Sequence, residues 1–114
     1  MNNTEVVDTA SKYIVKTTGV GSETNEVLVN AETELTGGTT GSKVSLIEGY
    51  YLIEGTGILT ISAGDEALPL DGKGKYGLRP GQLKFGNDKI FNLTTDSNVK
   101  SYLLVTEFRR ESNG

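Results

Sequence analysis

The feature that most constrains this chain is a series of short β-branched and apolar runs separated by Gly, Asn, Asp and Ser. Such runs are typical of strands joined by tight turns. Nowhere do apolar residues keep helical spacing for three turns. We therefore predict strands at 12–17, 26–31, 43–54, 57–62, 67–71, 75–79 together with 83–85, 89–94 and 99–108.

The length of 114 residues suits one domain. Strands at this spacing predict the fold class all-β, as a single-domain antiparallel β-sandwich or jelly-roll of about eight short strands. The expected organisation is a polar N-terminal arm at 1–11, a β-sandwich domain at 12–109 and a C-terminal tail at 110–114.

The residue inventory removes several kinds of chemistry. The chain contains neither Cys nor His, which excludes thiol nucleophiles, imidazole bases and Cys/His zinc sites. We expect no enzyme, and no catalytic residue, cofactor or metal. The net charge of −4 argues against nucleic-acid binding. No apolar run approaches the roughly 18–20 residues of a membrane helix, and no secretory signal is visible at the start.

Local patterns predict turns and one irregularity. The segment 54–57, Glu-Gly-Thr-Gly, fits a tight hairpin that uses a glycine with positive φ. The segment 79–82, Arg-Pro-Gly-Gln, fits a type II turn. In the 43–54 strand the apolar positions change parity between Leu46 and Tyr51. Either a β-bulge at Gly49 explains the change, or both faces of the strand are covered.

The last strand is apolar on both faces at 102–105. A half-solvated strand would alternate instead. We expect this strand either to lie in the middle of a sheet under other elements, or to meet another chain with one of its faces.

Charge and aromatic residues suggest an interaction surface. Segment 73–89 carries five bases and one acid, whereas 1–36 carries six acids and two bases. Segments of opposite sign can pair between subunits; solvated strand edges are the plainer interpretation. Adjacent strand residues point to opposite faces, so either Tyr50 or Tyr51 should face outward. The interface candidates are Tyr50, Lys73, Lys75, Tyr76, Arg79 and Lys84.

Outward tyrosines also allow an alternative function, a carbohydrate-binding or host-adhesion module, because aromatic rings stack on sugars. A glycosidase is not expected. Glu48 and Glu54 lie about 20 Å apart if they share one extended strand, which is too far for a catalytic pair.

Two resemblances to known families follow from longer stretches. The run Tyr50–Ile61, followed by Gly77–Gln82, superficially resembles the strand, glycine hairpin, strand and proline–glycine turn of cupins. Cupin enzymes hold a metal on histidines and a glutamate, and this chain has no histidine. This weaker resemblance therefore implies only a metal-free double-sheet roll.

The second resemblance covers more of the chain. Segments 43–46, 53–61, 70–79, 93–96 and 102–109 together resemble short virion structural proteins of tailed phages, of the type found in marine cyanophages. The resemblance implies a capsid decoration (cement) protein that binds and stabilises the phage head. Its implied partners are the major capsid protein of the same virus and further copies of itself, with a trimer favoured. It also implies location on the head surface of the virion after assembly in the host cytoplasm, and no catalytic residues.

Overall fold

The fold is described from a computed structural model, for residues 2–9, 12–33, 42–64, 66–77 and 85–111. This part of the chain forms ten strands and is all-β. The strands are Asn2–Asp8 (β1), Lys12–Gly19 (β2), Glu26–Asn30 (β3), Lys43–Gly55 (β4), Leu59–Ala63 (β5), Glu66–Leu70 (β6), Lys73–Gly77 (β7), Phe85–Asp88 (β8), Ile90–Thr95 (β9) and Val99–Glu111 (β10).

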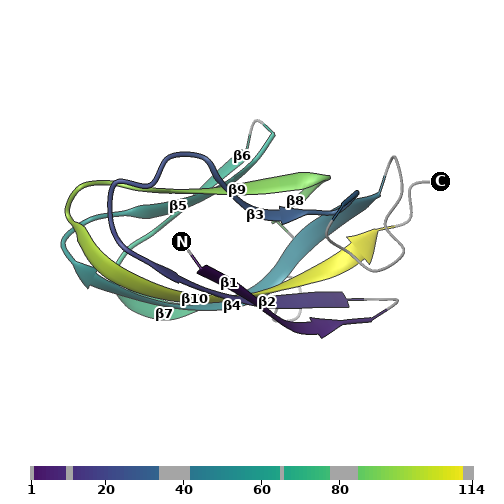
Figure 1. Ribbon diagram of the computed structural model, residues 1–114, viewed down its shortest axis with the longest axis horizontal. Helices are drawn as coiled ribbons and strands as arrows, with labels where there is room; N and C mark the ends of the chain where they lie inside the picture. The colour runs from purple at the N-terminus through teal and green to yellow at the C-terminus, as the bar shows by residue number, and fades with distance from the viewer. Residues whose placement is uncertain (1, 10–11, 34–41, 65, 78–84, 112–114) are drawn as a thin grey trace.

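Two antiparallel sheets form the layers of a sandwich (Figure 1). The larger sheet has the order β1-β2-β10-β4-β7. Strand β8 also pairs with β4, along a different stretch of that strand from β7. The smaller sheet has the order β3-β9-β5-β6. The predicted fold class is therefore confirmed. In place of the single strand expected at 75–79 with 83–85, the structure has β7 and β8. Strand β7 pairs with Glu48–Leu52, and β8 pairs with Val44 and Leu46.

Alternating side chains of both sheets build the core. Along β10 the side chains of Tyr102, Leu104 and Phe108 are buried, and they alternate with the more exposed Leu103 and Val105. At the centre Phe108 meets Phe91 of the smaller sheet edge to face, with ring centroids 4.9 Å apart. The two rings bridge the sheets, because they come from opposite layers.

Strand β10 lies between β2 and β4 in the middle of the larger sheet, but no described element lies over its outer face. Its apolar residues lie on both faces of the sheet. One face packs into the core, and the other carries Leu103, which is 36% exposed on the outside of the sheet.

The structure corrects the expectations for the N-terminal arm and the C-terminal tail. Residues 2–8 form the edge strand β1, paired with β2, instead of a free arm. This edge strand is polar because few of its side chains reach the core; Asn3 instead accepts a hydrogen bond from the Thr17 hydroxyl at 2.6 Å. At the other end, β10 continues past residue 109 to Glu111.

The expected hairpin at 54–57 is also wrong, although Gly55 does adopt a positive φ of +98°. The strands on either side do not pair, because β4 belongs to the larger sheet and β5 to the smaller one. The segment is a corner that joins the layers. The expected turn at 79–82 lies outside the described residues.

A bulge does occur in β4, two residues before the predicted position. Glu107 pairs with Glu48 and Phe108 with Leu46, so Ile47 is the extra residue. Gly49 stays in regular register opposite Thr106. The bulge explains the parity change, because Leu46 on one side of it and Ile53 on the other are both buried.

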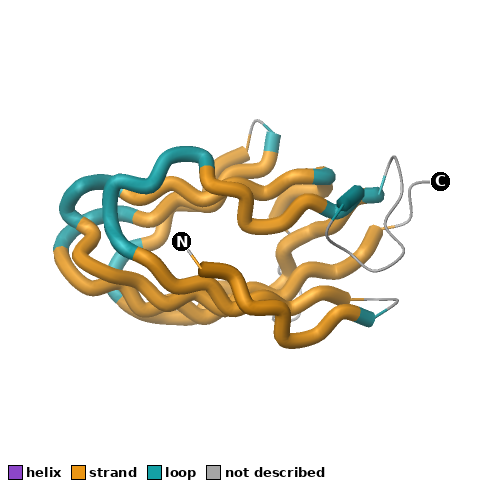
Figure 2. Tube along the Cα trace, in the orientation of Figure 1, coloured by secondary structure: helices purple, strands orange, loops and turns teal. Residues whose placement is uncertain are grey.

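One end of the sandwich is closed by loops that join the layers (Figure 2). Asp96 connects three of them. Its carboxylate accepts hydrogen bonds from the backbone N–H of Ile58 at 3.0 Å and of Asn98 at 2.9 Å. Its carbonyl oxygen accepts one from Ser22 N–H at 3.1 Å. These bonds hold the corner at 55–58 against its neighbours.

At the same end the hydroxyl of Tyr102 donates a short hydrogen bond to the carboxylate of Glu23. Burial raises the pKa of Tyr102 far above its usual value, and the hydrogen bond and the negative charge of Glu23 raise it further.

This pKa shift predicts a loss of stability at alkaline pH. Above pH of about 10 the unfolded chain releases the Tyr102 proton that the folded chain retains, so the free energy of unfolding should fall as pH rises. Chemical unfolding at several alkaline pH values measures the slope. Tyr102→Phe should have a shallower slope than the parent protein, and equal slopes would contradict the assignment.

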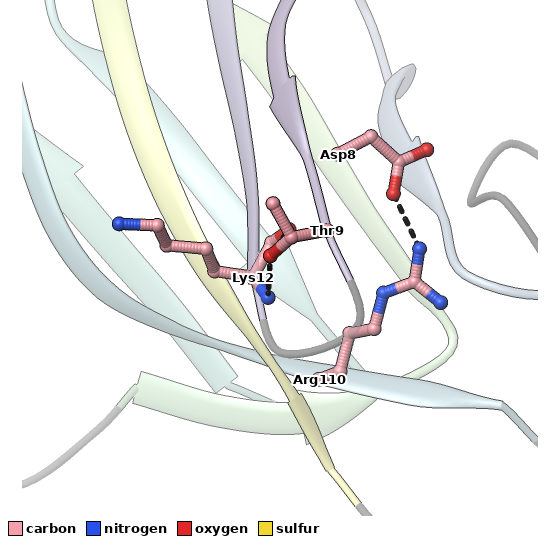
Figure 3. Close-up of polar contacts among 4 residues, drawn as sticks. All are labelled: Asp8, Thr9, Lys12 and Arg110. Atoms are coloured by element: carbon pink, nitrogen blue, oxygen red, sulfur yellow. Dashed lines mark hydrogen bonds and ion pairs between the residues drawn. The ribbon is translucent and has the colours of Figure 1, made fainter.

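At the opposite end Arg110 of β10 forms a short ion pair with Asp8 of β1, across the inner side of β2 (Figure 3). The Asp8 side chain is only 4% exposed and that of Arg110 19%. The pair ties the edge strand to the middle of the sheet.

Candidate functional site

The candidate site is the outer face of the larger sheet, which no other part of the described chain covers. Its centre consists of two cross-strand pairs. Leu103 of β10 lies opposite Leu52 of β4, and Val105 lies opposite Tyr50. All four point outward because the residues between them, such as Leu104 and Ile53, fill the core. We call Tyr50, Leu52, Leu103 and Val105 the apolar centre.

The apolar centre is accessible to solvent. Tyr50 is 54% exposed, Leu52 42% and Leu103 36%. Tyr50 lines two shallow hollows, one of about 290 Å³ that it shares with Leu52 and Leu103, and one of about 180 Å³ that it shares with Ile14 and Val105. Contiguous apolar surface of this kind usually marks a contact with a partner.

Charged side chains surround the apolar centre. The ammonium of Lys75, on the edge strand β7, donates to the Glu48 carboxylate at 3.0 Å and lies 5.3 Å from the centre of the Tyr50 ring. The hydrogen bond to Glu48 raises the pKa of Lys75, and the charge of Glu48 adds to the effect. The ion pair with Glu48 therefore places the Lys75 ammonium beside the apolar centre.

The strand register places further charged residues around the apolar centre. Lys73 lies opposite Leu52 on β7, and Lys16 lies opposite Val105 on β2. Glu107 faces Glu48 across β10 and β4. Basic and acidic groups thus alternate around the centre.

Three of the six interface candidates meet on this face. Tyr50, Lys73 and Lys75 lie together around the apolar centre. Tyr50 faces outward and Tyr51 packs against the core, as expected for adjacent strand residues. Tyr76 belongs to β7, but its side chain lies outside the described residues, as do Arg79 and Lys84 entirely.

The interface residues predicted from the sequence do not include Leu52, Leu103 or Val105. The two-sided apolar pattern of 102–105 was the signal that could have found two of them. Their alignment beside Tyr50 depends on the pairing of β10 with β4, which no local sequence pattern predicts.

Neither a metal centre nor a membrane helix is found in the described ranges. These residues contain no cluster of three or more acidic side chains placed to hold a metal ion. They also contain no helix with the length and apolarity that a membrane span requires. Glu48 and Glu54 lie on one strand with Tyr50 and Leu52 between them, about 20 Å apart at strand spacing.

No protein-family model matches this sequence, and no curated protein matches it. Among solved structures, the fold is similar to the crystal structure of a cupin domain from Bordetella pertussis Tohama I, with 11% sequence identity and a TM-score of 0.43. The alignment covers 97% of this chain and 93% of that chain.

Proposed function

We propose that this chain is a non-enzymatic structural protein of a virion, a decoration (cement) protein that binds the head and stabilises it. The observation that carries the proposal is the apolar centre, exposed on a six-stranded sheet and surrounded by charge. A protein that works by assembly needs such a surface on a scaffold that does not deform. The resemblance of the sequence to phage virion proteins supplies the setting, with the major capsid protein and further copies of this chain as partners.

The test is a binding experiment with heads assembled from the major capsid protein of the same virus. Co-sedimentation should retain the protein on the heads, and bound protein should raise the temperature at which the heads rupture. Leu52→Lys should reduce retention if the face takes part in assembly. Val27→Lys is the matched control, because Val27 is 40% exposed but lies on the smaller sheet. Heads that retain none of the parent protein would refute the decoration function.

A second candidate function, binding of a carbohydrate by the same face, is favoured by one observation. Tyr50 is more than half exposed and stands beside the two hollows. Sugars stack on such rings. A glycan array should then show binding that Tyr50→Ala abolishes, whereas Val27→Ala on the smaller sheet leaves it unchanged. An array without signal for the parent protein would remove this candidate.

A further inference from the structure

The charges on the outer face of the larger sheet follow a pattern that the proposed function does not explain. Lysines flank the apolar centre on the two neighbouring strands, β2 and β7. Lys16 lies on one side, on β2, and Lys73 and Lys75 lie on the other, on β7. These three lysines are exposed.

Glutamates lie at the other two sides, along the strand direction. Glu54, opposite Ser101, follows Leu52 at one end of the apolar centre, and Glu48 and Glu107 face each other at the other end. The sign of the charge therefore changes with each quarter turn around the centre. A surface with this pattern complements its own copy only when the two are crossed at a right angle.

We propose that a second copy of this chain docks on this face, with the strands of the two larger sheets crossed at about 90°. The inference rests on the proposed function only in that this face is an assembly surface. Orthogonal packing is one of the two common arrangements of facing sheets. The contact is two-fold symmetric, so each copy offers the same residues to the other.

The two-fold axis lies at about 45° to the strands, close to the diagonal of the apolar centre from Leu103 to Tyr50. Rotation about this line places Leu103 on its own counterpart, and Tyr50 on its own counterpart. Leu52 of one copy then covers Val105 of the other. These contacts follow from strand spacing of about 4.8 Å and a rise of about 6.8 Å for every second residue.

The same rotation brings the lysines of each copy onto the glutamates of the other. Each contact occurs twice, because the two-fold axis repeats it. The facing residues are Lys16 with Glu54, Lys73 with Glu107, and Lys75 with Glu48.

Aligned packing of the two sheets has the opposite effect. With a two-fold axis parallel to the strands, between β4 and β10, Lys16 of one copy faces Lys75 of the other. Glu48 then faces Glu107. Like charges placed opposite each other in an interface weaken binding. The charges therefore select the crossed arrangement although the apolar centre alone would allow both.

The area of the face predicts a weak, concentration-dependent dimer. Four strands and four rows of outward side chains cover roughly 500 Å² per copy, which is at the low end for specific interfaces. The product is a dimer, in contrast to the trimer that the phage resemblance implies.

Sedimentation velocity over a range of protein concentrations tests the dimer. The 12.2 kDa chain should shift toward twice its mass as concentration rises. Leu103→Lys should raise the dissociation constant about 100-fold or more, because it places two ammonium groups on the axis. Val27→Lys on the smaller sheet is the control and should dimerise like the parent protein. A monomer at all concentrations, a trimer, or dimerisation unchanged by Leu103→Lys would overturn the proposal.

Charge reversal tests the crossing angle. Lys16→Glu should weaken the dimer about tenfold, and adding Glu54→Lys to it should restore most of the affinity, because the two residues face each other. Adding Glu107→Lys to Lys16→Glu should not restore it. Rescue by Glu107→Lys alone would overturn the stated axis, since it indicates the other diagonal.

The readouts separate this inference from the proposed function. A dimer that is crossed as described but is not retained on heads refutes the decoration function and leaves the dimer standing. Retention on heads by a protein that stays monomeric refutes the dimer and leaves the decoration function standing.

Discussion

Phe108→Ala is expected to lower the free energy of unfolding by about 3–5 kcal/mol. The ring is fully buried in the middle of the larger sheet and meets Phe91 of the smaller sheet edge to face. Truncation removes the apolar contacts of the ring and leaves a cavity between two stiff layers. Because strands on both sides hold the layers apart, little collapse can fill it.

Urea unfolding followed by circular dichroism measures this loss. Leu103→Ala is the matched control on the same strand, and it should cost less than about 1 kcal/mol because its side chain faces outward. Phe108→Leu should fall between the two, since it retains much of the volume. A loss for Phe108→Ala no larger than that for Leu103→Ala would contradict the assignment of Phe108 to the centre of the core.

The strands could be predicted because alternation and turn residues are local. The runs around Val15, Ile61 and Leu104 each alternate with polar or outward residues, and all lie in strands as expected. Pairing is not local. The glycines at 55 and 57 indicated a sharp turn, but nothing nearby shows that the next strand joins the other sheet. The same limit applies to β1, whose polar residues make a strand only because β2 offers an edge to pair with.

The bulge in β4 shows how far a parity argument extends. The change of parity between Leu46 and Tyr51 requires one extra residue, yet any position between them satisfies it. Glycine is the residue expected there on conformational grounds, but the structure places the extra residue at Ile47. The partner strand decides, because Glu107 and Phe108 are successive residues on β10 and pair with Glu48 and Leu46.

The candidate site could be predicted only in part, because part of it depends on strand register. Tyr50, Lys73 and Lys75 stand out by residue type, so composition and charge found them. Leu52 and Leu103 are ordinary strand residues. They become part of a surface only through the register that places them opposite each other on the outside of the sheet.

The second large effect is expected at the ion pair between Asp8 and Arg110 (Figure 3). Arg110→Met should lower the free energy of unfolding by about 3 kcal/mol, because it removes the guanidinium that is paired with a carboxylate only 4% exposed. Asp8→Asn should cost less, since the Arg110 side chain is 19% exposed and its charge can reach water.

The double variant decides whether the effect arises from the pair. Asp8→Asn combined with Arg110→Met removes both charges, so it should be more stable than Arg110→Met alone. The three variants and the parent protein, unfolded in urea under one condition, form a complete double-mutant cycle. The destabilised variants should also expose β1 to hydrogen exchange before the core strands, because the pair ties this edge to β10. Additive losses within about 0.5 kcal/mol would show that the two side chains act separately and would contradict the coupling.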